Sequence, residues 1–325
     1  MSRYVLTGAS GHIGNNLVRL INRLEPLAEV VTLNRRKVTT ELIGTKVTQI
    51  IGDLNNIDFL RQNITKGDIV IHLACVIDLT NRKRDLMYST NYLMTKNICD
   101  TCNSVGVKKF VYIGSVDAIA RTGKEDVITE PNHYQPECIK SYYGKTKAVA
   151  TQYVLNAINE DPNFNCAIVL PSAVVGVNDY KPSAIGKVIL NVINNKAEFG
   201  IKGGYNFVDV RDVCQVIYTL CNSADRGQYI VSGHDVSVSE LYSMINNCLG
   251  VKKKPIIIPL PIVWLCMPFV PVLSPVTVKS LRETHNYSNA KMIDLGVKPR
   301  AIEDTFNDTI NWFVDNKTLF IDNNY

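Results

Sequence analysis

The chain lacks the features of several protein classes. No uninterrupted apolar run approaches the roughly 20 residues that a membrane-spanning helix needs. There is no low-complexity tract and no strong excess of one charge, because 35 basic side chains face 30 acidic ones and leave a net charge of +5. We therefore expect a globular protein of one large or two closely joined domains, with no affinity for nucleic acid.

Cysteine and histidine are too scattered for a metal centre. The nine cysteines are an odd number in apolar surroundings, and the chain enters a strand pattern at Tyr4 without a secretory signal. We therefore expect a reducing, cytoplasmic setting. Cys99 and Cys102 form a Cys-x-x-Cys pair, but no second pair stands at ligand spacing and the segment has a helical pattern. We expect no metal site.

One apolar segment, residues 255 to 273, is rich in proline. Its prolines remove backbone donors that lipid could not replace, so the pattern excludes a spanning helix. We expect a buried cap over an apolar pocket. A helix lying in the membrane interface is the alternative.

The chain opens with the pattern of a nucleotide-binding unit. A short β-branched strand leads into a turn with glycine at every third position, and a helical pattern follows over residues 15 to 22. Bare backbone N–H groups at a helix N-terminus suit a pyrophosphate. The cofactor-binding residues predicted here are Gly8, Ser10, Gly11, His12, Ile13 and Gly14.

The next predicted strand, residues 29 to 33, ends in Asn34, Arg35 and Arg36. This end should approach the adenosine ribose of a dinucleotide. An acidic residue there binds the 2′-hydroxyl of NAD, whereas arginine suits the 2′-phosphate of NADP. We therefore expect NADP(H) to be favoured, with NAD(H) as the alternative.

Strand and helix patterns continue to alternate. Apolar strands over residues 47 to 51, 68 to 74 and 110 to 114 are joined by segments that include a helical pattern at 88 to 105. This alternation predicts an α/β fold, a Rossmann-type doubly wound parallel sheet with a smaller C-terminal substrate-binding lobe. Ligands bind at the carboxyl ends of such strands. The residues expected there are Asp53, Leu54, Leu73, Ala74, Ser115 and Pro171.

The chain should pass more than once between a dinucleotide-binding domain and a substrate lobe. We expect residues 1 to 175 to form the dinucleotide-binding domain, with residues 206 to 232 returning to it. Residues 176 to 205 and 233 to 325 should form mainly the substrate lobe.

The pattern Tyr-x-x-x-Lys occurs three times, beginning at Tyr92, Tyr143 and Tyr287. On a helix, Tyr143 and Lys147 share one face, and Ser115 should end a neighbouring strand. A nearby cation favours the phenolate, so we expect it to lower the phenol pKa from about 10. Tyr143 is therefore the candidate acid/base. Tyr92 should pack between helices, and Tyr287 should lie in the late, substrate-side segment.

These motifs together resemble the extended short-chain dehydrogenase/reductase family, over most of the chain. The resemblance rests on seven segments in the family's order. They are residues 7 to 14, Gly52-Asp53-Leu54, His72-Leu73-Ala74, the helix around Asn91, residues 111 to 115, residues 143 to 147 and residues 207 to 213.

The resemblance implies a catalytic set with named roles. Tyr143 would donate or accept the proton, Lys147 would also hold the nicotinamide ribose, and Ser115 would polarise the substrate. Asn91 falls where the family has a supporting asparagine, and Asp53 where it has an aspartate near the adenine.

The substrate side favours a lipophilic molecule. Nucleotide-sugar epimerases of the family often carry arginine before Pro171, where this chain has Leu170. Residues 72 to 80 resemble 3β-hydroxysteroid dehydrogenases, and dihydroflavonol reductases also accept apolar residues near that proline. We expect an NAD(P)-dependent enzyme that interconverts a hydroxyl and a carbonyl on a steroid-like or bile-acid-like molecule or a related ketone.

Two other functions stay open. One is a nucleotide-sugar epimerase or dehydratase with bound NAD, and the other is a non-catalytic protein that senses NADP. Relatives suggest homodimerisation through residues 88 to 105 and 142 to 158, and the apolar segment suggests peripheral membrane contact.

Overall fold

A parallel sheet forms the centre of the molecule. The computed structural model describes residues 1–78, 82–121, 127–196, 198–266, 278, 281–282 and 286–320. Within these residues seven strands stand in the order β10-β6-β5-β4-β1-β2-β3. Their bounds are β1 Arg3–Thr7, β2 Glu29–Asn34, β3 Thr48–Ile51, β4 Ile69–His72, β5 Lys109–Ile113, β6 Cys166–Pro171 and β10 Gly227–Val231.

The inner strands are buried on both faces, as their apolar sequences require. All residues of β4, β5 and β6 are buried, and every neighbouring pair in the sheet is parallel. The chain winds outward from β1 in one direction to β3 and in the other through β4 to β10. Between β1 and β4 the winding therefore reverses, and this is where doubly wound folds bind their ligands.

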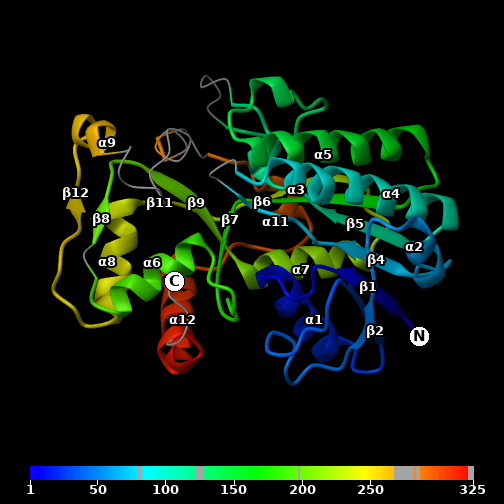
Figure 1. The fold of residues 1–325 in the computed structure, drawn as a ribbon, viewed down its shortest axis with the longest axis horizontal. Helices are drawn as coiled ribbons and strands as arrows, with labels where there is room; N and C mark the ends of the chain where they lie inside the picture. Colours follow the sequence, from blue (N-terminus) through cyan, green and yellow to red (C-terminus); the bar gives the residue numbers. More distant parts are fainter. Residues whose placement is uncertain are drawn as a thin grey trace.

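Helices cover both faces of the sheet (Figure 1). On one face two helices pack against each other, and three further helices cover the opposite face. The first pair is α1 His12–Leu24 and α7 Val210–Cys221. The opposite face carries α2 Ile57–Asn63, α4 Met94–Val105 and α5 Tyr142–Glu160.

A smaller lobe lies beyond β6, at the left of Figure 1. Its three-stranded sheet has the order β11-β9-β7 and packs with α6, α8 and α12 around a separate core that includes Phe207, Phe306 and Phe313. The bounds are β7 Ala173–Val175, β9 Gly204–Asp209, β11 His234–Ser237, α6 Ala184–Ile193, α8 Val238–Cys248 and α12 Ile302–Asp315.

Short elements complete the described chain. Near the predicted site they are α3 Arg84–Met87, the π-helix η1 Tyr88–Leu93, and the 3₁₀ turns η2 Val116–Ala118 and η3 Pro136–Cys138. At the lobe and the C-terminal part they are β8 Phe199–Gly200, β12 Ile256–Ile257, α9 Leu260–Cys266, α11 Ala290–Asp294 and η5 Lys317–Phe320.

The predicted fold class is confirmed, and two segments lie where we did not expect them. The strand at residues 204 to 209 pairs with β7 and β11 in the lobe, and only α7 and β10 after it join the main sheet. Residues 287 to 297 pack on the main sheet, because Met292 and Val297 are buried in its core. The division into a cofactor part and a substrate part stays a prediction.

Candidate active site

The glycine turn lies against the end of β4. Gly8 has φ +74°, and a Cβ atom there would lie 2.6 Å from the backbone nitrogen of Ala74. The backbone N–H of Leu73 donates to the carbonyl of Thr7 at 3.2 Å. A side chain at Gly8 would therefore push apart the two strand ends between which the sheet order reverses.

The turn leads directly into the N-terminus of α1. Gly11 is exposed and precedes the helix, and no side chain caps this end. The N–H groups in the first turn of α1 and the partial positive charge at this end of the helix are thus available to an anion. Ser10, His12 and Ile13 are half-buried around it, and Gly14 is buried beneath. These residues fit the diphosphate of a dinucleotide.

The helix N-terminus also holds a loop of the smaller lobe. The His12 ring bonds with the carbonyl of Val177 at 3.0 Å, and the Asn16 amide donates to the same oxygen at 3.0 Å. The buried Asn15 amide donates to the carbonyl of Asn178 at 3.1 Å. Asn15 and Asn16 were not singled out in the sequence, where consecutive asparagines on a helix give no sign of long-range contacts.

The end of β2 presents arginine to solvent. Asn34 is buried, and its amide donates to Thr32 Oγ1 at 2.9 Å, whereas Arg35 and Arg36 are exposed. Asp53, at the end of β3, is exposed and accepts from the backbone N–H of Asn55 at 2.9 Å. Its neighbour Leu54 is buried in the core. The arginines and Asp53 are thus exposed to solvent just after the ends of β2 and β3.

Asn91 connects the loop after β4 to α5. It is fully buried in the π-helix η1, and its side chain accepts from the N–H of Val76 at 2.8 Å and donates to the Val76 carbonyl at 2.9 Å. The same amide donates to Thr146 Oγ1 at 3.1 Å. Asn91 therefore fixes the loop that follows Leu73 and Ala74 beside the helix that carries Tyr143.

Ser115 and Tyr143 lie together at the carboxyl end of β5. Both are buried, and the Ser115 side chain lies near enough to the Tyr143 phenol to influence its pKa. Their approach depends on Gly144, where a Cβ atom would lie 2.6 Å from the carbonyl oxygen of Asp117. Gly144 belongs to the segment 143 to 147 but was not singled out in the sequence. A glycine beside the candidate tyrosine is the signal that could have identified this close contact.

Lys147 points toward the end of the same strand. Its Nζ donates to the carbonyl of Ile113 at 2.7 Å, and it lies 5.0 Å from the ring centroid of Tyr112. The side chain is 2% exposed, so its charge is held inside the fold. The structure thus brings Ser115, Tyr143, Lys147 and Asn91 to one place.

The expected lowering of the Tyr143 pKa is wrong. Burial raises the pKa of the phenol well above its ordinary value, and the Cys75 thiol and the Asp117 carboxylate raise it further. The nearby Ser115 hydroxyl lowers the pKa without reversing the direction. The physical reason is that taking the phenolate out of water costs more than its polar neighbours return. Tyr143 therefore keeps its proton at neutral pH.

A neutral histidine lies below the site. His72 is buried between the hydroxyls of Thr7 and Thr95, at 2.7 and 2.9 Å. Burial, and then the charge of Lys147, lower the pKa of His72 to about 3. Its ring therefore stays uncharged and connects β1, β4 and α4 through hydrogen bonds.

The other two Tyr-x-x-x-Lys copies have structural partners. The Lys96 ammonium pairs with Asp100 at 2.6 Å and with the Tyr153 hydroxyl, and Tyr92 packs edge-on against Tyr153 between helices, as expected. Tyr287 belongs to the main core rather than to a substrate-side segment. Lys291 donates to the carbonyl of Gln228 at 3.0 Å on the edge strand β10.

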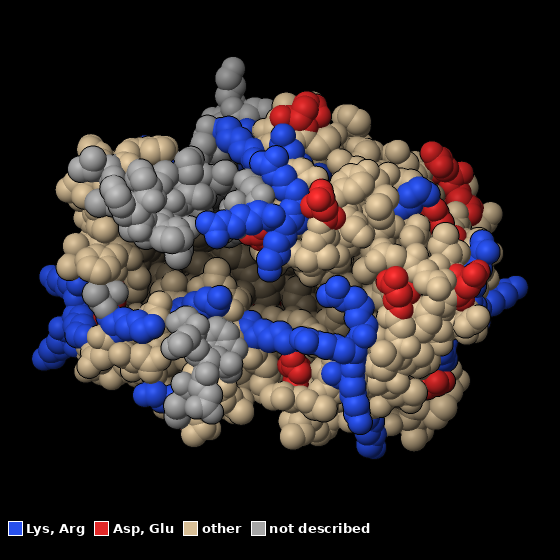
Figure 2. Space-filling model, viewed as in Figure 1, with Lys and Arg blue, Asp and Glu red and all other residues tan. Residues whose placement is uncertain are grey.

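The crevice has a basic rim. Figure 2 shows a hollow between the main body and the smaller lobe, flanked on both sides by lysine and arginine side chains. Arg84 lies over the Tyr142 ring at 5.4 Å, one residue from Tyr143. Pro171 ends β6, and Leu170 before it is fully buried.

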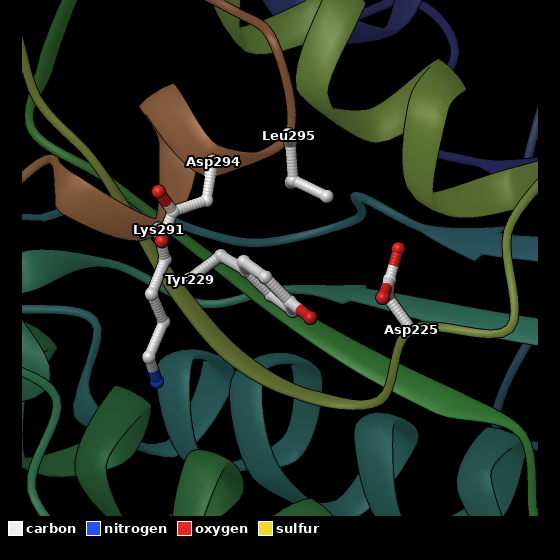
Figure 3. A pocket seen from close by; sticks show the side chains of 5 residues that line it. All are labelled: Asp225, Tyr229, Lys291, Asp294 and Leu295. Atoms are coloured by element: carbon white, nitrogen blue, oxygen red, sulfur yellow. The ribbon is translucent and has the colours of Figure 1, made fainter.

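A second pocket lies at the other end of β10 (Figure 3). It has a volume of about 260 Å³ and is lined by Asp225, Tyr229, Lys291, Asp294 and Leu295. Asp225 precedes the first residue of β10, so this pocket opens toward the amino ends of the strands. It therefore lies away from the predicted crevice.

The described part of the chain contains no candidate metal centre. No group of three or more histidine, cysteine or acidic residues there could hold an ion. Cys99 and Cys102 are buried inside α4, and burial raises the pKa of Cys99 to about 12. Neither thiol is poised as a thiolate ligand.

No described helix is long and apolar enough to cross a membrane. The expectation of a buried cap over residues 255 to 273 is wrong for the part that is described, which ends at residue 266, because Ile256, Ile262 and Trp264 are 58%, 49% and 52% exposed. The last part of the segment lies outside the described residues.

Comparison with protein families gives one match over most of the chain. The profile described as the NAD dependent epimerase/dehydratase family matches residues 4–235. This range contains all the predicted site residues.

Three curated relatives are similar at low identity. A protein of Synechocystis named "Putative dihydroflavonol 4-reductase" is 27% identical, over 95% of this chain and 94% of that protein. A 3beta-hydroxysteroid-dehydrogenase/decarboxylase of Arabidopsis thaliana is 26% identical, over 91% and 75% respectively. The human sterol-4-alpha-carboxylate 3-dehydrogenase, decarboxylating, is 28% identical, over 66% of this chain and 56% of that protein.

Solved structures share the whole fold. The crystal structure of gox2253 has a TM-score of 0.83 and 25% identity, over 97% of this chain and 99% of that one. UDP-glucose 4-epimerase of Thermotoga maritima, solved with UDP-glucose, has a TM-score of 0.80 and 16% identity, over 97% and 99%. The second likeness shows the fold alone.

Proposed function

This chain belongs to the NAD dependent epimerase/dehydratase family, and from that premise we propose that it interconverts a hydroxyl and a carbonyl on a lipophilic small molecule. It is an NAD-dependent oxidoreductase of the extended short-chain type. The proposal concerns its substrate, its catalytic residues and its cofactor preference.

The neighbouring hydroxyls of Ser115 and Tyr143 carry the proposal. Two hydroxyls that meet at the carboxyl end of a strand can both bond to one substrate oxygen. Tyr143 lies one helical turn from Lys147, and Cys75 of the loop that Asn91 holds lies near its phenol. This arrangement supports proton transfer to a carbonyl oxygen.

The residues divide the reaction between them. When bound at the glycine turn and the N-terminus of α1, NAD(P)H would provide the hydride for the carbonyl carbon. Tyr143 donates its proton to the oxygen as negative charge develops there, and Ser115 donates a hydrogen bond that orients that oxygen. Lys147 places a buried cation beside the site, and Asn91 keeps the loop after β4 in position. Oxidation runs the same steps backward, with the Tyr143 phenolate as the base.

Two observations favour a lipophilic substrate. The relatives named above carry the words dihydroflavonol, hydroxysteroid and sterol, all rigid ring systems with a hydroxyl or carbonyl. The position before Pro171 is Leu170, which is buried in the main core, so no side chain there can bind the diphosphate of a nucleotide sugar as an arginine would.

The cofactor we favour is NADP(H). Arg35 and Arg36 stand exposed after β2, where a 2′-phosphate would need a guanidinium. Arg35→Ala and Arg36→Ala, made separately, should raise the KM for NADPH at one of the two positions and leave the KM for NADH nearly unchanged. Equal effects on both cofactors at both positions would contradict this preference.

The function is tested with a panel of steroids, bile acids, flavonoid ketones and aldehydes, each with NADH and NADPH. We expect cofactor oxidation with at least one lipophilic ketone. Activity confined to a UDP-sugar or dTDP-sugar, with NAD that copurifies, would establish a nucleotide-sugar epimerase or dehydratase instead. Tight NADP binding without turnover of any class would favour the NADP-sensing protein.

Association with a second copy is part of the proposal. The faces of η1 and α5 hold Tyr92 and Tyr153, and Tyr88 and Leu93 of η1 are exposed beside them. Light scattering after size exclusion measures the mass of the assembly. A monomer at all concentrations would contradict a homodimer.

A further inference from the structure

The smaller lobe exposes a group of large apolar side chains. They come from β8, β12 and α9, and we call them the lobe-end patch. Phe199 is 54% exposed, Ile256 58% and Trp264 52%. The patch consists of Phe199, Ile256, Ile257, Ile262 and Trp264.

The elements under the patch hold these side chains outward. β8 and β12 pair in parallel with Ile256 opposite Phe199, so their side chains are neighbours. On α9, Val263 is 1% exposed and packs with Ile201, which anchors the helix. Ile262 and Trp264 flank this anchor on the two sides of the helix. The exposure thus belongs to packed elements and not to a free chain end.

Exposed lysines lie next to the patch along the chain. Lys196 and Lys202 flank β8, and the run of residues 252 to 254 precedes β12 as three exposed lysines. The acidic Glu198 between them is buried and accepts from the Asn246 amide at 2.8 Å. Figure 2 shows lysine and arginine side chains gathered at this end of the molecule.

An apolar surface with tryptophan and a lysine border matches one partner in chemistry. Isoleucine and phenylalanine gain by leaving water, and tryptophan favours the boundary between headgroups and acyl chains. Lysines next to such a surface attract anionic headgroups. We propose that the lobe-end patch is a docking surface for an anionic lipid bilayer.

The contact would be peripheral. No described helix could cross a membrane, and the exposed residues would insert only to the level of the headgroups. Docking would bring the lobe to the phase in which a lipophilic substrate dissolves. The side chains of the lobe-end patch lie outside the predicted active site, so membrane docking can be tested independently of the activity.

Vesicle binding tests the proposal. Trp312 packs against the rings of Tyr180 and Phe320, and Trp312→Phe keeps an aromatic ring there and leaves Trp264 as the sole tryptophan. We expect this variant to sediment with vesicles that mix phosphatidylcholine and phosphatidylglycerol, and its emission to shift to shorter wavelength. Pure phosphatidylcholine or high salt should weaken the binding.

Substitutions then separate the two contributions. Reversing all three lysines, Lys252→Glu, Lys253→Glu and Lys254→Glu, should weaken binding by about 100-fold or more, at about fivefold for each lysine. Ile256→Ser should weaken it as well. The matched control is Ile43→Ser, which changes an isoleucine that is 69% exposed after β2, and it should bind as the parent does.

Three outcomes would overturn the proposal. They are no sedimentation with anionic vesicles, equal loss in the Ile256→Ser and Ile43→Ser variants, and a dimer that Ile256→Ser dissociates in lipid-free solution. The last result would assign the patch to a second copy of the chain. Turnover on a soluble ketone is measured in parallel, so a failure of docking is distinct from a failure of the proposed activity.

Discussion

Replacing Asn91 by alanine should weaken the attachment of the loop after β4 to the helices of the candidate site. The side chain is fully buried and makes three hydrogen bonds, two with the backbone of Val76 and one with Thr146. At roughly 1 kcal/mol net for each bond, Asn91→Ala should lower the free energy of unfolding by about 3 kcal/mol. The loop after Ala74 would lose its attachment to η1, so the cofactor should bind more weakly as well.

Urea unfolding followed by circular dichroism measures the stability, and NADPH titration measures the binding. Asn97→Ala is the matched control, since Asn97 lies two turns further along the same helical segment and donates one long bond of 3.3 Å to the carbonyl of Asn55. It should cost less than about 1 kcal/mol. If Asn91→Ala lost no more stability than this control and bound NADPH normally, the role given to Asn91 would be wrong.

Two further predictions concern the turn and the tyrosine. Gly8→Ala should destabilise the protein by about 2 kcal/mol or more and weaken NADPH binding, because the new Cβ would meet the Ala74 backbone; Gly44→Ala, with the same sign of φ but open space, should cost about 1 kcal/mol. Equal costs in urea unfolding would refute the clash. Asp117→Asn removes a carboxylate that raises the Tyr143 pKa, so the alkaline loss of ketone reduction should begin at lower pH. A pH profile of kcat/KM that stays in place would contradict that electrostatic contact.

The main sheet could be predicted because its strands carry strong local signals. β4, β5 and β6 are nearly continuous apolar runs, and the glycine turn sits between a strand and a helix, so order and type followed from pattern alone. The lobe was harder. β9 precedes a helix that packs under the main sheet, and no local pattern tells whether such a strand joins the larger or the smaller sheet.

The residues of the candidate site could be predicted from the sequence, whereas the contacts of Asn91 and the pKa of Tyr143 could not. The register of Tyr143 and Lys147 on one helix face follows from spacing, whereas the π-helix that turns Asn91 toward Val76 has no sequence signature we could use. The sign of the Tyr143 pKa shift depends on burial and on Asp117, both of which need the fold. Spacing to Lys147 suggested the opposite direction.

The central claim is that Tyr143 transfers the proton, and Tyr143→Phe tests it most directly. Phenylalanine keeps the ring in its buried place and removes the hydroxyl that lies near Ser115. With the best ketone from the panel, kcat should fall by at least about 100-fold while NADPH still binds with a similar Kd. Turnover close to that of the unchanged protein would contradict the account.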